Sequence, residues 1–272
     1  MIKVTLTNEI LSYITEIEQN RYKVSSVKLS KAVMNRLRKN SKKKSSYASN
    51  KIEGNPLSEK QVDEVIESDE RKHYLKPEQE VRNYFLALNY LEEKVNKKEK
   101  FSKKLILDVQ KLVEKGASKE KIGLRGPMPP GVLFAVYNSK TGNPDYIPPE
   151  YCDIPGLLDE LIEYVNTTDD HPLIVAAVVH YQLVTIHPFE DGNGRTARLL
   201  SGYIMDLNGY GFNGVGSLEE YFAYDIDEYY ESIQMGLPAL YYSGRENPPH
   251  PEIWIHYFLR MVKLYSGKVC DL

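Results

Sequence analysis

A glycine-rich turn between two helical patterns is the feature that most constrains how this chain folds. The turn, Gly192-Asn193-Gly194, follows an apolar run from Leu173 to Ile186, which is too long for a typical strand and favours a buried helix. From Arg195 onward, apolar residues recur at helical spacing. They are Leu199, Leu200, Tyr203, Ile204 and Leu207. The sequence therefore predicts one buried and one amphipathic helix, joined by a tight loop.

The loop also carries groups that are suited to catalysis. His187 has an ordinary pKa of about 6.5, which suits proton abstraction near neutral pH. Asp191 is a hard oxygen ligand of the kind that Mg²⁺ accepts. A glycine turn that opens a helix presents free N–H groups at the positive end of the helix dipole, and this end binds anions. Arg195 and Arg198, three residues apart, can both lean over such an anion. These residues predict a polyphosphate site.

Two other interpretations of the turn stay open. Its glycines fit a loose dinucleotide-binding fingerprint, but that motif must follow a strand and needs an acid about 20 residues further on. Phe212 stands near that position. The stretch could also be a structural turn between two helices, although such a turn would need neither the histidine nor the arginines. We favour the phosphate site.

The stretch His187-Pro188-Phe189-Glu190-Asp191-Gly192-Asn193-Gly194-Arg195-Thr196-Ala197-Arg198 resembles the Fic family motif without a departure. That motif reads His-x-Phe-x-Asp/Glu-Gly-Asn-Gly-Arg-x-x-Arg. The resemblance implies a mainly α, Fic-type helical domain with a β-hairpin flap. It also implies Mg²⁺-dependent transfer of AMP from ATP onto Ser, Thr or Tyr hydroxyls of proteins, including self-modification. The phosphotransferring branch of the family has Lys in place of the second motif glycine, so Gly194 argues against that branch.

The resemblance further implies a role for each fixed position. It implies that His187 deprotonates the target side chain, that Asp191 holds Mg²⁺ on the phosphates, and that Phe189 anchors the loop to the core. The residues that would bind the phosphates are Gly192, Asn193, Gly194, Arg195 and Arg198. ATP is then the co-substrate, Mg²⁺ the cofactor, and the partner an unidentified target protein.

A second motif lies near residue 50. Ser49 and Glu53 share one face of a helix that Gly54 is expected to end, which places the Glu53 carboxylate at a helix C-terminus, where the dipole disfavours it. From the residues alone, Glu53 is either a tolerated exposed glutamate or one that a distant cation compensates. The segment is similar to the Fic inhibitory helix, Ser/Thr-x-x-x-Glu-Gly/Asn. This resemblance implies that Glu53 pairs with Arg198 and obstructs the ATP γ-phosphate.

The segment from about 123 to 149 is rich in Gly, Pro and β-formers. Residues 132–137 and 146–147 flank a turn-rich stretch and predict a hairpin. An isolated hairpin is only marginally stable, so this one must pack against another part of the chain. It resembles the Fic flap, which implies that its exposed edge docks a segment of the target protein. The residues expected there are Val132, Val136 and Tyr146. The alternative is that the segment has only a structural role.

Elsewhere the chain shows ordinary helical stripes. These predict helices near residues 8–18, 58–66, 77–95, 102–116 and 157–165. The basic stretch 36–44 is interpreted as a solvated helix end or a linker rather than a nucleic-acid arm, because the whole chain is slightly acidic, with a net charge of -3. His180 lacks metalloprotease spacing to His187 and is expected to be a packed core histidine.

We therefore expect an N-terminal helical extension over 1–48 and a Fic domain over 49–272, with the inhibitory helix at 49–54 and the active-site motif at 187–198. The charge favours neither nucleic acid nor membrane as a partner. A cytoplasmic location is expected, because no signal-peptide pattern or apolar run of about 20 residues is visible. A homo-oligomer stays open. The alternative functions are removal of AMP from modified proteins using Glu53, and a non-enzymatic interaction scaffold.

Overall fold

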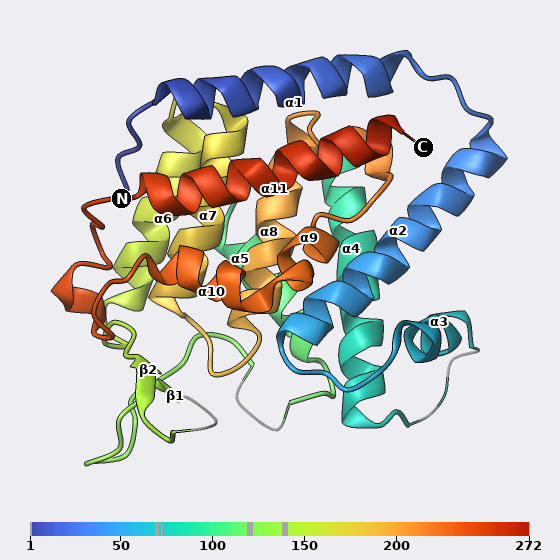
Figure 1. Ribbon diagram of the computed structural model, residues 1–272. Helices are drawn as coiled ribbons and strands as arrows, with labels where there is room; N and C mark the ends of the chain where they lie inside the picture. Colours follow the sequence, from blue (N-terminus) through green and yellow to red (C-terminus); the bar gives the residue numbers. More distant parts are fainter. Residues whose placement is uncertain (1, 69–70, 72, 119–121, 138–140, 272) are drawn as a thin grey trace.

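The two helices on either side of the motif loop, residues 187–192, lie at the centre of the computed structural model, which describes residues 2–68, 71, 73–118, 122–137 and 141–271 (Figure 1). α7 (Pro172–Ile186) is buried along almost its whole length, as expected for a helix that is apolar on nearly every face. α8 (Asn193–Leu207) packs closely against it. The predicted pair of helices joined by a tight loop is confirmed.

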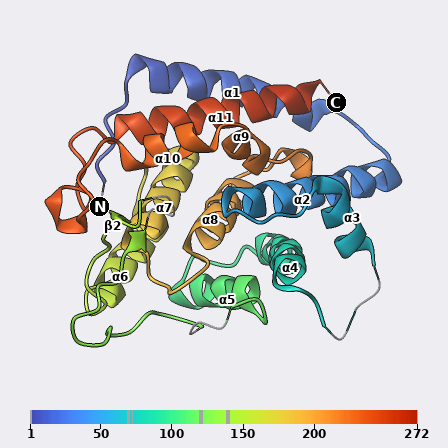
Figure 2. The same ribbon diagram turned by 60° about the horizontal axis from the view of Figure 1, so that its bottom comes forward.

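Helices from both ends of the chain enclose this pair. α1 (Asn8–Ser26) lies along α11 (Glu252–Cys270), as Figures 1 and 2 both show, and α11 packs on α7. α4 (Lys76–Asn96) and α5 (Lys103–Glu114) pack against α8. The remaining helical elements, apart from α2, are α3 (Glu59–Glu67), α6 (Ile154–Thr167), η1 (Phe212–Gly214), α9 (Glu219–Tyr224), α10 (Ile226–Gln234) and η2 (Tyr241–Ser243). Within the described ranges, none of the helices is long and apolar enough to cross a membrane.

Helix starts follow the local capping signals in the sequence. Ser58 and Gln61 form a capping box, in which each side chain accepts a hydrogen bond from the backbone N–H of the other residue. Ser102 caps α5 by accepting from the backbone N–H of Leu105 at 3.2 Å. Pro77 lies in the first turn of α4, where its missing N–H costs nothing. The helices predicted from these signals are confirmed.

The structure corrects the interpretation of the basic stretch 36–44. This stretch lies inside α2 (Lys31–Ile52) and is neither a helix end nor a linker. Acidic side chains of neighbouring helices pair with its lysines. The buried Lys43 ammonium lies 2.8 Å from Glu67 and 3.4 Å from Asp63 of α3. α2 also crosses residue 48 without a break, so the division into an extension and a Fic domain stays a prediction.

A two-stranded antiparallel sheet is the strand element of the described chain. β1 (Val136–Tyr137) pairs with β2 (Pro144–Tyr146), with Val136 opposite Tyr146. The predicted fold class, mainly α with one small hairpin, is confirmed. The strands are shorter than predicted, because Val132 lies in a turn in which its N–H donates to the Pro129 carbonyl at 3.0 Å. The predicted turn includes residues 138–140, which lie outside the described residues.

Candidate active site

His187 ends α7 and turns the chain toward the motif loop. Its backbone is left-handed, with φ 49° and ψ 58°, which is uncommon for a residue other than glycine. The Nδ1–H donates to the Val184 carbonyl at 3.1 Å, so Nε2 is left with the lone pair in the neutral ring. Burial lowers the pKa of His187 to about 4. The imidazole is therefore neutral at pH 7 and can accept a proton at Nε2.

Asn193 closes the loop between the two helices. Its side-chain Nδ2 donates to the Phe189 carbonyl at 2.9 Å, and its Oδ1 accepts from the Phe189 N–H at 3.0 Å. The Phe189 ring is buried in the hydrophobic core. The Asn193 side chain thus fixes the loop by bonding both backbone groups of Phe189.

The start of α8 has the geometry of an anion site. Gly192 is its N-cap and has φ +82°, a conformation that glycine adopts without strain. The first intrahelical hydrogen bond runs from the Thr196 N–H to the Gly192 carbonyl at 2.9 Å. The backbone N–H groups of Asn193, Gly194 and Arg195 therefore have no acceptor within the helix. They form the positive end of a 15-residue helix.

A carboxylate from α2 lies at this end of α8. Glu53 follows the last turn of α2, and its Oε1 is 2.6 Å from Arg198 Nη2. A Cβ built on Gly194 would lie 2.3 Å from the same Oε1, so only glycine admits the carboxylate there. Burial opposes ionisation of Glu53, but Arg198 and then Arg195 outweigh it and hold the pKa of Glu53 below its usual value.

Ser49 holds the arginine of this pair. Arg198 Nε donates to the Ser49 hydroxyl at 2.8 Å, and Nη2 donates to the Ser49 carbonyl at 3.0 Å. Gly54, with φ +80°, ends the helix just beyond Glu53. The structure therefore places Ser49, Glu53 and Arg198 in one contact network that joins α2 to α8.

A cavity of about 150 Å³ brings the histidine and this network together. Its walls come from the motif, from α2, from the two-stranded sheet and from α10. The lining residues include His187, Glu53, Arg198, Val136, Tyr146, Tyr229 and Tyr230. The Tyr146 hydroxyl donates to the Thr185 carbonyl, which ties the sheet to α7. Val132 lines a separate groove among prolines of the 126–134 segment.

Arg195 lies outside the described lining of this cavity and sits among carboxylates. Its Nη2 is 3.0 Å from Glu114 Oε1 and 3.3 Å from Asp191 Oδ1, and its Nη1 is 3.7 Å from Glu80 Oε1. The Arg195 side chain is only 4% exposed. Sequence reasoning missed Glu114 and Glu80, because their contacts with Arg195 connect segments far apart in the chain.

Asp191 has the chemistry of a Mg²⁺ ligand. Its side chain is 37% exposed, and its Oδ1 accepts from the Gly192 N–H at 2.7 Å and from Arg195. Its Oδ2 accepts no hydrogen bond from the part of the chain that the structure describes. Arg195 is shared among Asp191, Glu114 and Glu80, so it does not neutralise Asp191 alone, which favours a cation. Mg²⁺ commonly binds through one or two carboxylates together with phosphate oxygens and water. The residues present fit such an ion.

His180 is a core residue, as predicted. It is fully buried among aromatic rings, including Trp254 at a centroid distance of 4.9 Å, and burial holds its pKa well below the usual value. Its Nε2 lies 2.9 Å from the Tyr229 hydroxyl, which also accepts from Arg198 Nη1 at 3.4 Å. Tyr229 is thus a further support of Arg198 that the sequence did not indicate.

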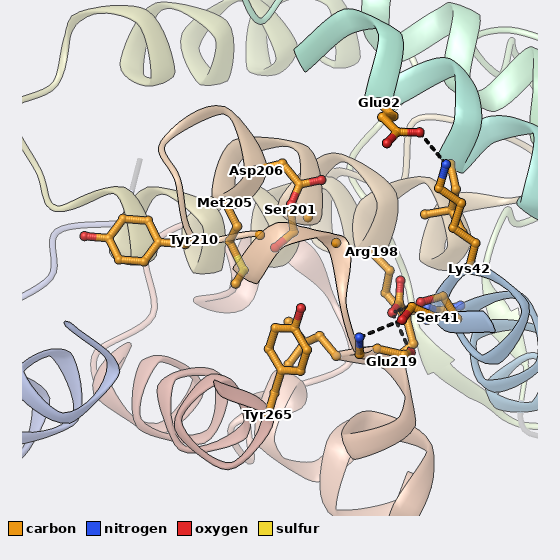
Figure 3. Close-up of a pocket in the computed structure, with 18 of the residues that line it drawn as sticks. Ser41, Lys42, Glu92, Arg198, Ser201, Met205, Asp206, Tyr210, Glu219 and Tyr265 are labelled. Atoms are coloured by element: carbon orange, nitrogen blue, oxygen red, sulfur yellow. Dashed lines mark hydrogen bonds and ion pairs between the residues drawn. The ribbon is translucent and has the colours of Figure 1, made fainter. Parts of the chain in front are cut away.

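α2 is attached to the domain largely by polar contacts. Arg198 also lines a second cavity, of about 140 Å³, whose other walls include α2, α4 and α8 (Figure 3). There the Ser41 hydroxyl accepts from the Gly216 N–H at 2.7 Å, and the Lys42 ammonium lies 2.5 Å from Glu92. The buried Ser45 hydroxyl donates to Glu219 at 2.8 Å. The helix that carries Glu53 is therefore held by specific hydrogen bonds and ion pairs.

Comparison with known proteins identifies the domain. Residues 100–205 match the model of the Fic/DOC family. This chain contains a Fic domain. The matched segment includes α5, the sheet, α7 and most of α8, and with them the whole Fic motif from His187 to Arg198.

Relatives and solved structures agree with this. The chain is 28% identical over 204 residues to the protein adenylyltransferase Fic of Drosophila grimshawi, covering 72% of this chain and 40% of that protein. It is 29% identical over 202 residues to that of Aedes aegypti, covering 71% and 38%. The chain thus spans less than half the length of these curated relatives. A Fic family protein from Desulfovibrio desulfuricans G20 superposes with a TM-score of 0.76 at 21% identity, covering 100% of this chain and 77% of that one. Fic-1 from C. elegans gives 0.72 at 22% identity, covering 96% and 71%. These structures share the Fic fold.

Proposed function

We propose that this chain is a protein adenylyltransferase, which transfers AMP from ATP to Ser, Thr or Tyr hydroxyls of proteins. One observation carries the proposal: a neutral histidine stands in the same cavity as an arginine-bearing helix N-terminus, and a carboxylate already lies where that terminus would bind a phosphate. The names of the relatives from Drosophila grimshawi and Aedes aegypti support the same reaction.

In the proposed reaction His187 is the general base. Its Nε2 accepts the proton of the target hydroxyl while the hydroxyl oxygen attacks the α-phosphorus of ATP, a P–O bond to the β-phosphate breaks, and pyrophosphate leaves. The backbone N–H groups of Asn193 and Gly194, which the Gly192 turn presents, stabilise together with Arg198 the charge that develops on the phosphates. Asp191 would hold Mg²⁺, which would supply partial neutralisation of the phosphate charge. Phe189 keeps the loop in place.

The sheet is the proposed docking site for the target. Val136 and Tyr146 line the cavity that contains His187, and Val136 is exposed. A strand edge can bind an extended segment by main-chain hydrogen bonds, which would align a hydroxyl without close selection of the surrounding side chains. Val132, which precedes the strand, would extend this surface.

Glu53 is the proposed inhibitor. Its carboxylate pairs with Arg198 over Gly194, so a γ-phosphate placed there would meet like charge and an arginine that is already engaged. Ser49 and Gly54 support this inhibition, because Ser49 fixes the Arg198 side chain and Gly54 ends the helix directly after Glu53. ATP would then bind in a pose unsuited to attack.

Removal of AMP is a second candidate, which the position of Glu53 favours. Its side chain is 33% exposed and lines the same cavity as His187. A carboxylate in that position could orient a water molecule toward the phosphorus of a modified side chain. In that case Glu53 is both an inhibitor of transfer and a catalytic group for hydrolysis.

The reaction class is tested with ATP labelled either at the α-phosphate or at the γ-phosphate. Lysate protein is incubated with the Glu53→Gly variant, Mg²⁺ and each label. AMP transfer predicts that only the α-label stays on protein, and that adding His187→Ala abolishes this signal while ATP still binds. Retention of the γ-label would indicate phosphate transfer instead, and retention of neither would contradict the proposal.

A further inference from the structure

Glu114 is a buried carboxyl group that the proposed reaction does not use. It ends α5, and its side chain is only 2% exposed. A carboxylate at a helix C-terminus is disfavoured by the dipole, and burial adds a further cost. Within the described residues, neither of its oxygens has a hydrogen bond of good geometry, although Arg195 Nη2 lies 3.0 Å away. An amide or apolar side chain would avoid this cost.

The position of Glu114 connects it to the anion turn. A Cβ built on Gly192 would lie 2.4 Å from Glu114 Oε1, so the carboxyl group lies directly against the backbone that opens α8. One turn earlier in α5, Gln110 Nε2 donates to the Asp191 carbonyl at 3.3 Å. α5 therefore supports the turn at two points, and both adjoin Asp191 or the residue after it.

Arg195 is shared between two carboxylates by the same nitrogen. Nη2 is closer to Glu114, at 3.0 Å, than to Asp191, at 3.3 Å. With Glu114 uncharged, the guanidinium would have Asp191 as its nearest charged partner. A paired Arg195–Asp191 would compete with a cation for the Asp191 oxygens, because an arginine fork covers a carboxylate with two parallel hydrogen bonds.

We propose that Glu114 is a positioning residue, which holds Arg195 partly away from Asp191 and so keeps the Asp191 carboxylate available to Mg²⁺. This inference rests on the proposed function, in which Asp191 binds the metal that accompanies ATP. Arg195 then acts through the two carboxylates and not by contact with the phosphates. The same arrangement agrees with the cavity lining, which includes Arg198 and not Arg195, although both arginines are buried.

The consequence is confined to the metal-dependent part of nucleotide binding. Replacing a supporting residue of a metal ligand typically weakens metal affinity by about 10- to 100-fold. Glu114→Gln should therefore raise the Mg²⁺ concentration needed for half-maximal ATP binding about tenfold or more. Binding of ATP without metal should not fall, because the N–H groups and Arg198 remain. Excess Mg²⁺ should restore transfer to the parental kcat.

The experiment uses the full chain with Glu53→Gly, so that the cavity is open, and measures ATP binding by calorimetry with a Mg²⁺ series and with EDTA. Glu114→Gln is compared with this parent and with Glu92→Gln, a control on α4 that removes an ion-paired glutamate away from the turn. A tenfold or larger loss of Mg²⁺ affinity in Glu114→Gln alone, with binding in EDTA unchanged, is the expected result.

Other outcomes separate the inference from the proposed function. Equal Mg²⁺ affinity in parent and Glu114→Gln overturns the inference and leaves AMP transfer standing. An equal loss with and without metal overturns it too, since Glu114 would then only support the fold. If the Glu53→Gly parent binds no ATP at all, the proposed function fails. If Glu114→Gln does not fold, Glu114→Asp, whose shorter side chain draws the carboxylate back from Arg195, must show the same metal-specific loss.

Discussion

The Glu53 carboxylate and the Arg198 guanidinium lie 2.6 Å apart, across the interface between α2 and α8. Each group stands at the helix end where its charge is disfavoured, the carboxylate just past a C-terminus and the arginine in the first turns after an N-terminus. Their contact offsets the unfavourable interaction of each charge with the dipole of its own helix. It also places a negative charge against Gly194, where the geometry of α8 would otherwise favour a phosphate.

The lowered pKa of His187 predicts an unusual pH dependence. Because a general base must be deprotonated and burial lowers the pKa of His187 to about 4, its protonation should not limit transfer above about pH 5.5. We expect kcat/KM of the Glu53→Gly variant to stay level between pH 8 and pH 5.5. A loss of activity centred near pH 6.5, the ordinary histidine value, would show that the pKa of His187 is not lowered as described or that His187 is not the base.

The sheet can be tested by separating target modification from nucleotide binding. Val136→Pro removes an N–H from β1 and should reduce modification of protein targets, because main-chain pairing is the proposed means of docking. The affinity for ATP should change little. Val136→Ala, which keeps the N–H, is the matched control and should retain modification. Equal losses in the two variants would assign the effect to the side chain rather than to the backbone.

Glu114 predicts a pH-dependent stability. Burial raises the pKa of Glu114 to about 7. Arg195 lowers this pKa, but the negative charges of Asp191 and Glu80 raise it further. Because this carboxyl binds its proton more tightly in the folded state, its ionisation lowers the free energy of unfolding as the pH rises from about 4.5 to 7. The full decrease is about 3 kcal/mol.

Urea unfolding at two pH values checks this. Glu114→Gln should match the parent near pH 5 and be more stable than the parent at pH 8, because the amide carries no charge to bury. If the two proteins differ by the same amount at both pH values, Glu114 does not titrate as described.

Features that depend on neighbouring residues could be predicted from the sequence. The capping box at Ser58, the helix end at Gly54 and the turn at Gly192 each rest on contacts or backbone angles within a few residues. α7 could be predicted because its apolar run leaves few alternatives to burial. The prediction for the basic stretch of α2 is wrong because its lysines pair with acidic residues of α3 and α4, and these contacts have no signal in the local pattern.

The candidate site shows the same limit. The motif indicated which residues gather at the loop, but not which way each side chain turns. Asn193 uses its amide on the backbone of Phe189, and Arg195 turns to Glu114, whose contact spans 81 residues of sequence. Such long-range partners follow from the packing of α4 and α5 against α8, which helix periodicity alone does not determine.

The restraint by Glu53 is the central claim, and the mass spectrum of the purified chain tests it most directly. The parental protein, Glu53→Gly and Arg198→Ala are each incubated with ATP and Mg²⁺. The account predicts that Glu53→Gly gains the mass of AMP, because its phosphate site is free and its own hydroxyls are always nearby. The parent should gain little, and Arg198→Ala should gain none, because it loses the phosphate contact together with the restraint. Equal and unchanged masses in the parent and Glu53→Gly would contradict the account.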